Sequence, residues 1–141
     1  MLPFLNVDIN RTVLAVNVGG CIIPVFISFY LLKGMPIGSA ILGITIMSIV
    51  SYFSSRPVKH IGIRVSFIFP LIMIIIVSMI IAEPHIRAKF AYICGTLGLL
   101  IGADILHLKD FDKLGKGVLS IGGAGVFDSV FFIGIISAFL L

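Results

Sequence analysis

Apolar residues form five long, nearly continuous runs along the chain, and short polar or charged stretches separate them. A run that approaches about 20 apolar residues is typical of a membrane-spanning helix. Strands of a membrane barrel would instead alternate apolar and polar residues in stretches of about ten. The pattern therefore predicts an all-α, polytopic helical membrane protein that forms one domain over residues 1–141. The expected spans cover residues 12–32, 36–54, 65–82, 90–106 and 117–141.

Residues that bend or break helices interrupt the first and the last of these runs. Pro24 removes a backbone donor from the first run and is expected to kink it. The last run begins with the glycine-rich segment 117–125, which predicts either a bent or re-entrant entry or close helix packing. With a bent entry, the last helix would start near Val126, and Asp128 would lie in its first turn, where the helix dipole favours an anion. No internal repeat is evident.

The composition favours a membrane protein over a soluble one. Of the 141 residues, 60% are hydrophobic and 11% are charged, whereas a soluble domain carries about 25% charged residues. The net charge of +4 does not predict nucleic-acid binding, because no basic stripe with interleaved aromatic residues is present. Cys21 and Cys94 lie apart in apolar runs and do not have the spacing of a metal site. The expected surroundings are the lipid bilayer, and no cofactor is expected.

Basic residues are distributed unevenly between the two expected sides of the membrane. Five spans place the termini on opposite sides, and Lys and Arg mark the cytoplasmic side. Seven basic residues fall on the N-terminal side, namely Arg11, Arg56, Lys59, Arg64, Lys109, Lys113 and Lys116. Three fall on the other side, namely Lys33, Arg87 and Lys89. We therefore expect a multi-pass cell-membrane protein with a cytoplasmic N-terminus, a cytoplasmic 107–116 loop and an external C-terminus.

Asp104 and Asp128 are the two acids that lie in strongly apolar surroundings. A carboxylate at membrane depth costs about 2.5–3.5 kcal/mol on insertion scales, so such a residue is a functional-site hypothesis by default. If the two carboxylates meet, they share a proton, and one can act as base while the other acts as acid on a peptide carbonyl. If they stay apart, a proton- or cation-coupled pathway is the more natural use.

Other residues are expected to support this acidic site. Asn17 lies inside the first apolar run and needs a hydrogen-bond partner there. It could bond the glycine-rich elements or line the acidic site itself. Glycines flank both acids and would let backbones approach closely. The expected supporting residues are Asn17, Gly102, Gly122, Gly123 and Gly125.

A metal site is an alternative use of the acids near residue 104. Asp104, His107 and Asp110 are spaced so that one helical face could present all three. Oxygen and nitrogen ligands of this kind bind divalent metals. A solvated loop face explains His107 and Asp110 equally well, and the prediction is that no metal is bound.

Several stretches of the chain resemble a family of small archaeal and bacterial membrane proteins known as Domain of Unknown Function 1614. The matching stretches are residues 17–20 with 23–24, 55–58, 91–98, 100–104 and 120–128. The resemblance covers nearly the whole chain and carries no established activity. It implies a small polytopic membrane protein.

More distantly, the chain is similar to the GxGD aspartyl intramembrane proteases, which include presenilin, signal peptide peptidase and the prepilin peptidases. These proteins place one aspartate on each of two neighbouring spans, and the resemblance implies that Asp104 and Asp128 are catalytic. In this chain two residues separate Gly125 from Asp128. Three hypotheses follow: a peptidase-like protein with a membrane-protein substrate, a small proton- or cation-coupled transporter or channel, and a membrane scaffold subunit. A homodimer would help five spans to enclose a cavity.

Overall fold

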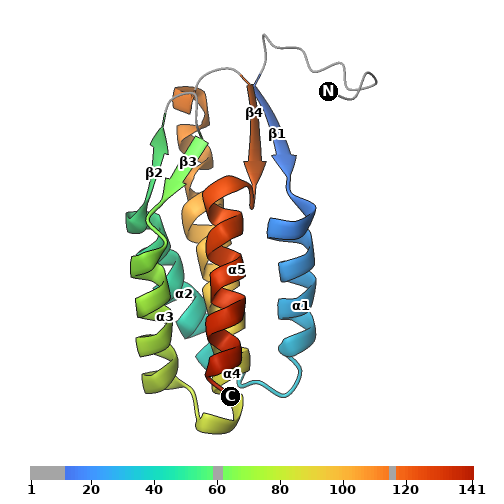
Figure 1. The fold of residues 1–141 in the computed structure, drawn as a ribbon, viewed down its shortest axis with the longest axis vertical. Helices are drawn as coiled ribbons and strands as arrows, with labels where there is room; N and C mark the ends of the chain where they lie inside the picture. Colours follow the sequence, from blue (N-terminus) through green and yellow to red (C-terminus); the bar gives the residue numbers. More distant parts are fainter. Residues whose placement is uncertain (1–11, 59–61, 115–116) are drawn as a thin grey trace.

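The computed structural model describes residues 12–58, 62–114 and 117–141. Within these ranges five α-helices form one elongated bundle (Figure 1). Their bounds are α1 Ile23–Leu31, α2 Ile37–Ser54, α3 Ile68–Ile81, α4 Arg87–Leu99 and α5 Ala124–Phe139. Short π-helical or 3₁₀ segments extend them, namely η1 Val18–Ile22, η2 Pro84–Ile86, η3 Leu100–Asp104 and η4 Ile105–Leu114. The prediction of a mostly helical protein is confirmed.

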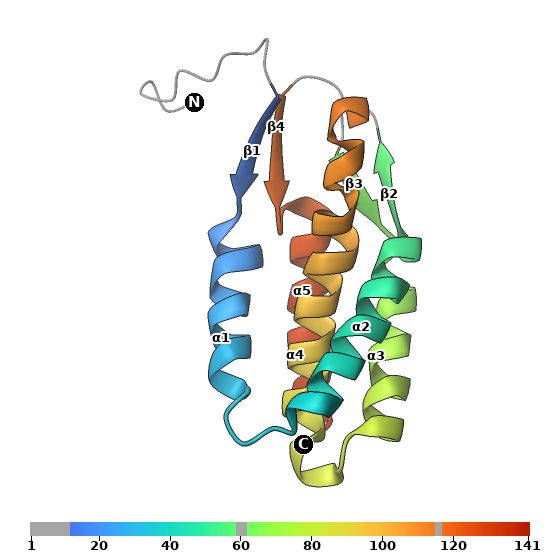
Figure 2. The same ribbon diagram turned by 180° about the vertical axis from the view of Figure 1, so that it is seen from behind.

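The helices run alternately in opposite directions along the bundle. Figures 1 and 2 show that the described chain begins at the end where the strands lie, and that α5 brings the C-terminus to the opposite end. Two continuous helical segments are long and apolar enough to cross a membrane, Ile37–Ser54 with 18 residues and Pro84–Asp110 with 27 residues. Three further apolar segments, Val18–Leu31, Ile68–Ile81 and Gly125–Phe139, are shorter.

The expectation of an all-α protein is wrong in one respect, because four short strands lie at one end of the bundle. Strand β1 (Thr12–Val16) pairs in parallel with β4 (Gly117–Ile121), and β2 (Ser55–Val58) pairs antiparallel with β3 (Gly62–Val65). The stretch 12–16 was expected to be helical, and 117–121 was expected either to form a bent or re-entrant entry or to pack closely as part of a helix. Their branched residues favour a pleated backbone, and the ladder pairs backbone groups that would otherwise lack partners in an apolar environment.

Helix α4 is the centre of the packing and contacts all four other α-helices. Its fully buried side chains include Phe90, Ile93, Cys94 and Leu99. The contact with α2 is especially close, because Gly98 lies directly against Met47, and Gly102 lies against the carbonyl oxygen of Ser48. Small residues that let helix backbones approach are typical of helix packing in membranes.

The outside of the bundle is apolar along most of its length. Large exposed side chains occur on every α-helix except α4, and they include Phe26, Phe29, Ile41, Phe53, Ile80 and Phe139. Several hydroxyl groups within the helices bond the carbonyl oxygen of the preceding turn, as when Ser28 donates to Pro24 over 2.8 Å and Ser137 donates to Ile133 over 2.7 Å. These hydroxyls therefore need no water.

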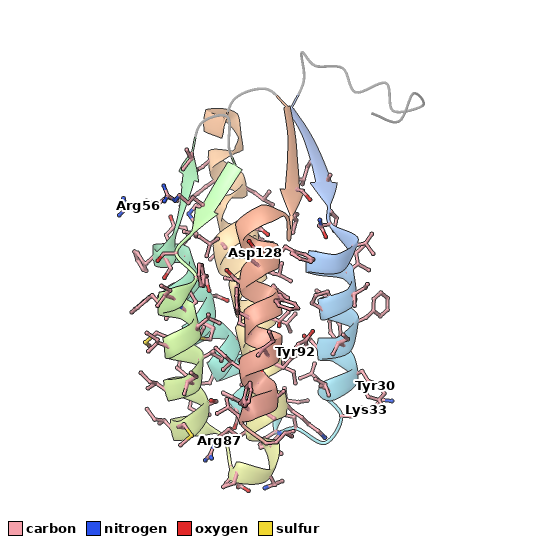
Figure 3. The ribbon with its side chains drawn as sticks, viewed as in Figure 1. Tyr30, Lys33, Arg56, Arg87, Tyr92 and Asp128 are labelled. Carbon is pink, nitrogen blue, oxygen red and sulfur yellow. The ribbon has the colours of Figure 1, made fainter. Side chains whose placement is uncertain are left out.

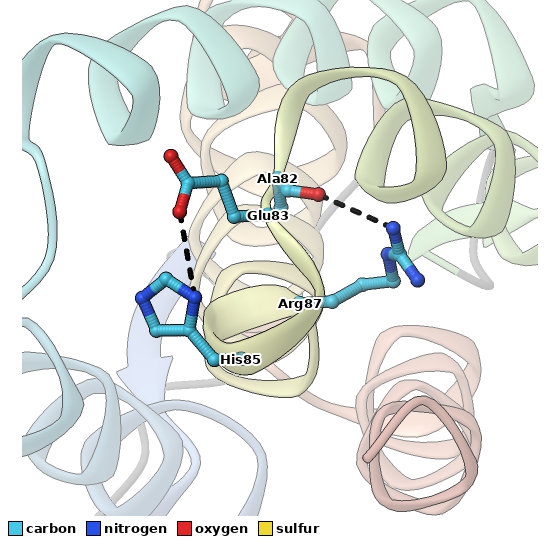
Figure 4. A network of polar contacts seen from close by, with 4 residues as sticks. All are labelled: Ala82, Glu83, His85 and Arg87. Carbon is cyan, nitrogen blue, oxygen red and sulfur yellow. Dashed lines mark hydrogen bonds and ion pairs between the residues drawn. The ribbon is translucent and has the colours of Figure 1, made fainter.

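The turn between α3 and α4 carries the polar contacts of the opposite end (Figure 4). His85 Nδ1 lies 3.4 Å from a Glu83 carboxylate oxygen, and both side chains are largely exposed. Arg87 Nη2 donates to the carbonyl oxygen of Ala82 over 3.4 Å, at the C-terminal end of α3. A cation at this position satisfies a carbonyl group that the helix leaves unpaired.

The close packing of α2 on α4 predicts the effect of a single methyl group. Gly98→Ala would place Cβ too close to Met47, and such overpacking costs about 1–3 kcal/mol. Gly38→Ala, in the first turn of α2, meets nothing within 4 Å and should be neutral or stabilising by up to about 1 kcal/mol. The melting temperatures of the two variants are compared by thermal unfolding in detergent. Unfolding is followed with a fluorogenic thiol reagent that reaches the buried Cys94 only after the protein unfolds. Equal melting temperatures would contradict the close packing.

Candidate functional site where strands meet helices

The candidate site lies where β1 and β4 pass into helices. The parallel register pairs TVLAV with GVLSI, so the backbone of Val13 pairs with Val118 and that of Leu14 with Leu119. A pair of glycines follows each strand, Gly19–Gly20 before α1 and Gly122–Gly123 before α5. The expectation that the chain lacks a repeat is therefore wrong at this local level. The two strand–glycine–helix units lie side by side with the same direction (Figure 1).

The two units touch through their glycines. Gly122 has φ +76°, a backbone conformation that favours glycine. A Cβ on Gly20 would collide with the carbonyl oxygen of Gly122, and a Cβ on Gly122 would lie 2.8 Å from the backbone nitrogen of Cys21. Both positions therefore need glycine because the backbones themselves are in contact.

Asn17 closes the end of the β1–β4 ladder. Its backbone N–H donates to the carbonyl oxygen of Ile121 over 2.8 Å. Its side-chain Oδ1 accepts from the N–H of Gly20, also over 2.8 Å, and so caps η1. Asn17 thus satisfies one backbone acceptor, on β4, and one backbone donor, in η1, at the junction of strand and helix.

Asp104 connects this junction to the central helix. It ends η3, is only 6% exposed, and accepts a 2.7 Å hydrogen bond at Oδ2 from the N–H of Gly122. Gly122 is the turn residue between β4 and α5, so the bond ties the end of α4 to the entry of α5. A hydrogen bond from a backbone N–H to an ionised carboxylate is short and strong.

Asp128 lies in a different environment. Helix α5 begins at Ala124, two residues earlier than expected, so Asp128 lies in the second turn and not in the first. Its side chain is exposed on α5 (Figure 3). Asp128 is four residues beyond Ala124, which corresponds to roughly 6 Å of helical rise. Within the described residues no hydrogen bond joins the two carboxylates.

The remaining glycines play unequal parts. Gly102 allows α4 to approach Ser48 and Tyr52 of α2. Gly123 is the N-cap residue of α5, and its carbonyl oxygen accepts from the N–H of Val126 over 3.1 Å. A Cβ on Gly125 would meet only the backbone nitrogen of Val65, at 3.8 Å. Of the predicted glycines, only Gly122 bonds the candidate acids.

His107 is buried and does not face a metal site with Asp104 and Asp110. Its Nδ1–H donates to the carbonyl oxygens of Ala103 at 2.9 Å and Gly102 at 3.1 Å, and its ring stacks on Tyr52 with centroids 4.7 Å apart. Among the described residues, no three His, Cys, Asp or Glu side chains gather into a metal-binding group. His107 therefore closes the end of the central helix against α2.

Gly20 was given no role in the site on the basis of the sequence, and His107 was considered only as a metal ligand or a solvated loop residue. The signal for Gly20 was the repeated pattern of an apolar strand followed by two glycines. The signal for His107 was weaker, because its position next to a charged segment resembles a solvated loop. Gly20 carries no ionisable group, and the imidazole of His107 stands beside a charged segment, so the sequence marks neither residue as part of the buried junction.

These features describe a small, mostly helical protein that has long apolar helices and a buried acid at a strand–helix junction. The chain belongs to the family described as protein of unknown function DUF1614, whose model matches residues 1–140. Comparison with curated proteins gave no match, and comparison with solved structures gave none either. The suspected similarity to GxGD proteases finds no support in these comparisons.

Replacing Asp104 separates its hydrogen bond from its charge. Asp104→Asn keeps an oxygen that can accept the Gly122 N–H, whereas Asp104→Ala leaves that buried donor unsatisfied, at a cost of about 1–3 kcal/mol. We expect Asp104→Ala to melt clearly below Asp104→Asn in the thiol-reagent assay. Equal melting of the two variants would show that the bond to Gly122 contributes little to stability.

The glycine contact gives a second prediction. Gly122→Ala and Gly34→Ala both place a side chain at positive φ, but Gly34 has open space around it. Positive φ alone costs about 1–2 kcal/mol for a residue with Cβ. Gly122→Ala should cost more than that, because its Cβ would also push against Gly20. Similar losses for both variants in thermal unfolding would leave only the backbone conformation as the cause.

Proposed function

We propose that the protein is a multi-pass membrane protein whose five apolar segments cross or enter the bilayer. Two helices have sufficient length and apolar character, and the exposed surface of the bundle is rich in large apolar side chains. The shorter segment Val18–Leu31 has 14 residues, roughly 21 Å of helix, and β1 extends it at one end. The excess of Lys and Arg on the strand-bearing side supports a cytoplasmic orientation of that side.

Within this protein, we propose that Asp104 and Asp128 form the reactive site of an aspartyl peptidase-like hydrolase. The observation that carries the proposal is the bonding of Asp104. Its carboxylate is buried, its one hydrogen-bond partner among the described residues is the N–H of Gly122, and its other oxygen has none there. An ionised carboxylate accepts several hydrogen bonds, so this oxygen can receive a water or a shared proton.

The chemistry requires Asp128 to approach Asp104. Gly122 is the pivot on which such a movement depends, since it precedes α5 and already bonds Asp104. Once together, the two acids hold one proton between them. The ionised carboxylate removes a proton from water as the water oxygen adds to the peptide carbonyl carbon, and the protonated carboxyl gives its proton to the carbonyl oxygen. Collapse of the diol then breaks the C–N bond, and the amine leaves with a proton.

The neighbouring strands offer a place for an extended substrate. Within the described residues, β1 and β4 form a sheet of two strands only, so each strand has one edge free of strand partners. An extended peptide can add to such an edge through main-chain hydrogen bonds. This supports a peptide substrate that unwinds near the membrane surface.

One observation favours a second function, a proton- or cation-coupled transporter. The two carboxylates lie in different environments, one buried at the junction and one exposed on α5. Acids at separate positions along a helix bundle are typical of proton relays. In this role Asp104 would carry a proton between states without meeting Asp128.

The experiment uses three amide variants of the full chain reconstituted in liposomes. Asp104→Asn and Asp128→Asn should each reduce cleavage of a co-reconstituted single-span membrane protein by at least about 100-fold, as expected for loss of a general acid or base. Glu83→Gln, at the exposed turn at the other end of the bundle, is the matched control and should cleave normally. Melting temperatures confirm that each variant is folded.

The same liposomes separate the two functions. Cleavage that persists in both Asn variants would end the peptidase proposal. If no preparation cleaves, but a pH gradient dissipates in the parent protein and not in Asp104→Asn, the transporter takes its place. A protein that neither cleaves nor conducts, and whose Asn variants behave as the parent does, would be a scaffold.

A further inference from the structure

Two arginines face each other across the antiparallel pair β2–β3. The register places Arg56 directly opposite Arg64, and both side chains are exposed. Residues directly opposite in such a pair have Cβ atoms about 4.5–5.5 Å apart, and like charges there are destabilising. An anion that bridges the two guanidinium groups would relieve this repulsion.

Within the described ranges, no ion pair joins Arg56 or Arg64 to a carboxylate. The ion pair found among the described residues joins Glu83 and His85, at the opposite end of the bundle. In Figure 3, Arg56 projects outward from β2, away from the helices. The two guanidinium groups therefore present a concentrated positive charge to the surroundings at the level where α2 ends and α3 begins.

The two arginines help to line a hollow of about 620 Å³ that also has an apolar wall. Arg56, Arg64, Ser54 and Ser66 provide its polar part, and the wall consists of Phe53, Val65, Phe67, Ile68 and Phe69. Three wall residues are well exposed, with Phe53 at 76%, Ile68 at 61% and Phe69 at 52%. The hollow therefore has two kinds of lining, arginines that suit an anionic group and exposed apolar side chains that suit hydrocarbon.

We propose that this hollow binds an anionic phospholipid of the leaflet on the strand-bearing side. The headgroup phosphate lies between Arg56 and Arg64, where planar guanidinium groups can each offer paired donors. The acyl chains run down the phenylalanine wall. Basic pockets at the membrane surface are known to bind phosphorylated headgroups. The proposal rests on the membrane location of the protein and is independent of the chemistry of Asp104 and Asp128.

A soluble phosphorylated ligand fits the hollow less well. It would use the two arginines but would leave the aromatic wall exposed to water. Simple setting of topology also fails to explain the pair, because the positive-inside rule depends on the number of basic residues and not on which strand positions face each other. The arginine pair and the exposed aromatic wall together favour a lipid as the ligand.

The test measures lipid retention by native mass spectrometry of the full chain after reconstitution in mixed phosphatidylglycerol and phosphatidylcholine nanodiscs. The parent protein should retain phosphatidylglycerol in preference to phosphatidylcholine. Arg56→Gln/Arg64→Gln should reduce this preference roughly 30-fold, as expected for two basic residues at a membrane surface. Arg56→Lys/Arg64→Lys keeps the charge but loses the paired donors. Its preference for phosphatidylglycerol should lie between that of the parent and that of the Gln double variant. Lys33→Gln/Arg87→Gln, at the other end of the bundle, is the matched control for charge.

Two further measurements keep the result unambiguous. The Gln double variant should melt no lower than the parent in phosphatidylcholine alone, because it removes a repulsion between neighbouring strands. Soluble glycerol 3-phosphate at the same concentration should not displace the retained lipid. Equal retention of the two lipids by the parent, or unchanged preference in the Gln variant, would overturn the proposal. Full displacement by glycerol 3-phosphate would also overturn it and would indicate a soluble ligand.

Discussion

The whole strand-bearing end depends on one requirement, that backbone groups surrounded by apolar residues find partners within the chain. Two chain segments enter the bundle as strands and change to helix, and each change leaves donors without intrahelical acceptors. Asn17 satisfies one side of the junction, and the carboxylate of Asp104 satisfies the other. Contact between Gly20 and Gly122 brings the two sides close enough for a single ladder to end there.

This requirement gives a buried carboxylate a structural use before any chemistry is considered. A carboxylate oxygen is a strong acceptor for the N–H of a turn residue, and the bond to Gly122 partly offsets the cost of burying Asp104. The same bond controls the entry to α5, which carries Asp128. The hydrogen bond between Asp104 and Gly122 thus has a structural role and also involves a residue of the proposed reactive site.

The sequence predicts the helical class and much of the layout, because continuous apolar runs are a local signal. Helix α2 starts directly after Pro36 and ends at Ser54, as the run 36–54 predicts. The strands were not predictable in this way. Five residues of β1 pair with five of β4, and only their mutual contact distinguishes them from the start of an apolar helix.

In the candidate site too, some features could be predicted from the local sequence and others depend on contacts between distant residues. Asp104 and Asp128 are conspicuous in the sequence as acids in apolar surroundings, but the partner of Asp104 is a backbone N–H, which any residue other than proline could supply. The pairing of Arg56 with Arg64 likewise depends on a hairpin register that the run of letters does not reveal. The chemical roles of both acids stay predictions.

The parallel register has a consequence for the order in which the protein assembles. Thr12 pairs with Gly117, and the offset of 105 positions is the same for every pair in the ladder (117 minus 12). During synthesis β1 must therefore wait, unpaired, until nearly the whole chain has emerged, because contacts between distant residues form late. Helices α2, α3 and α4 can pack first and provide the surface against which the two strands meet. The junction that holds Asp104 can form only after β4 and Gly122 have been made.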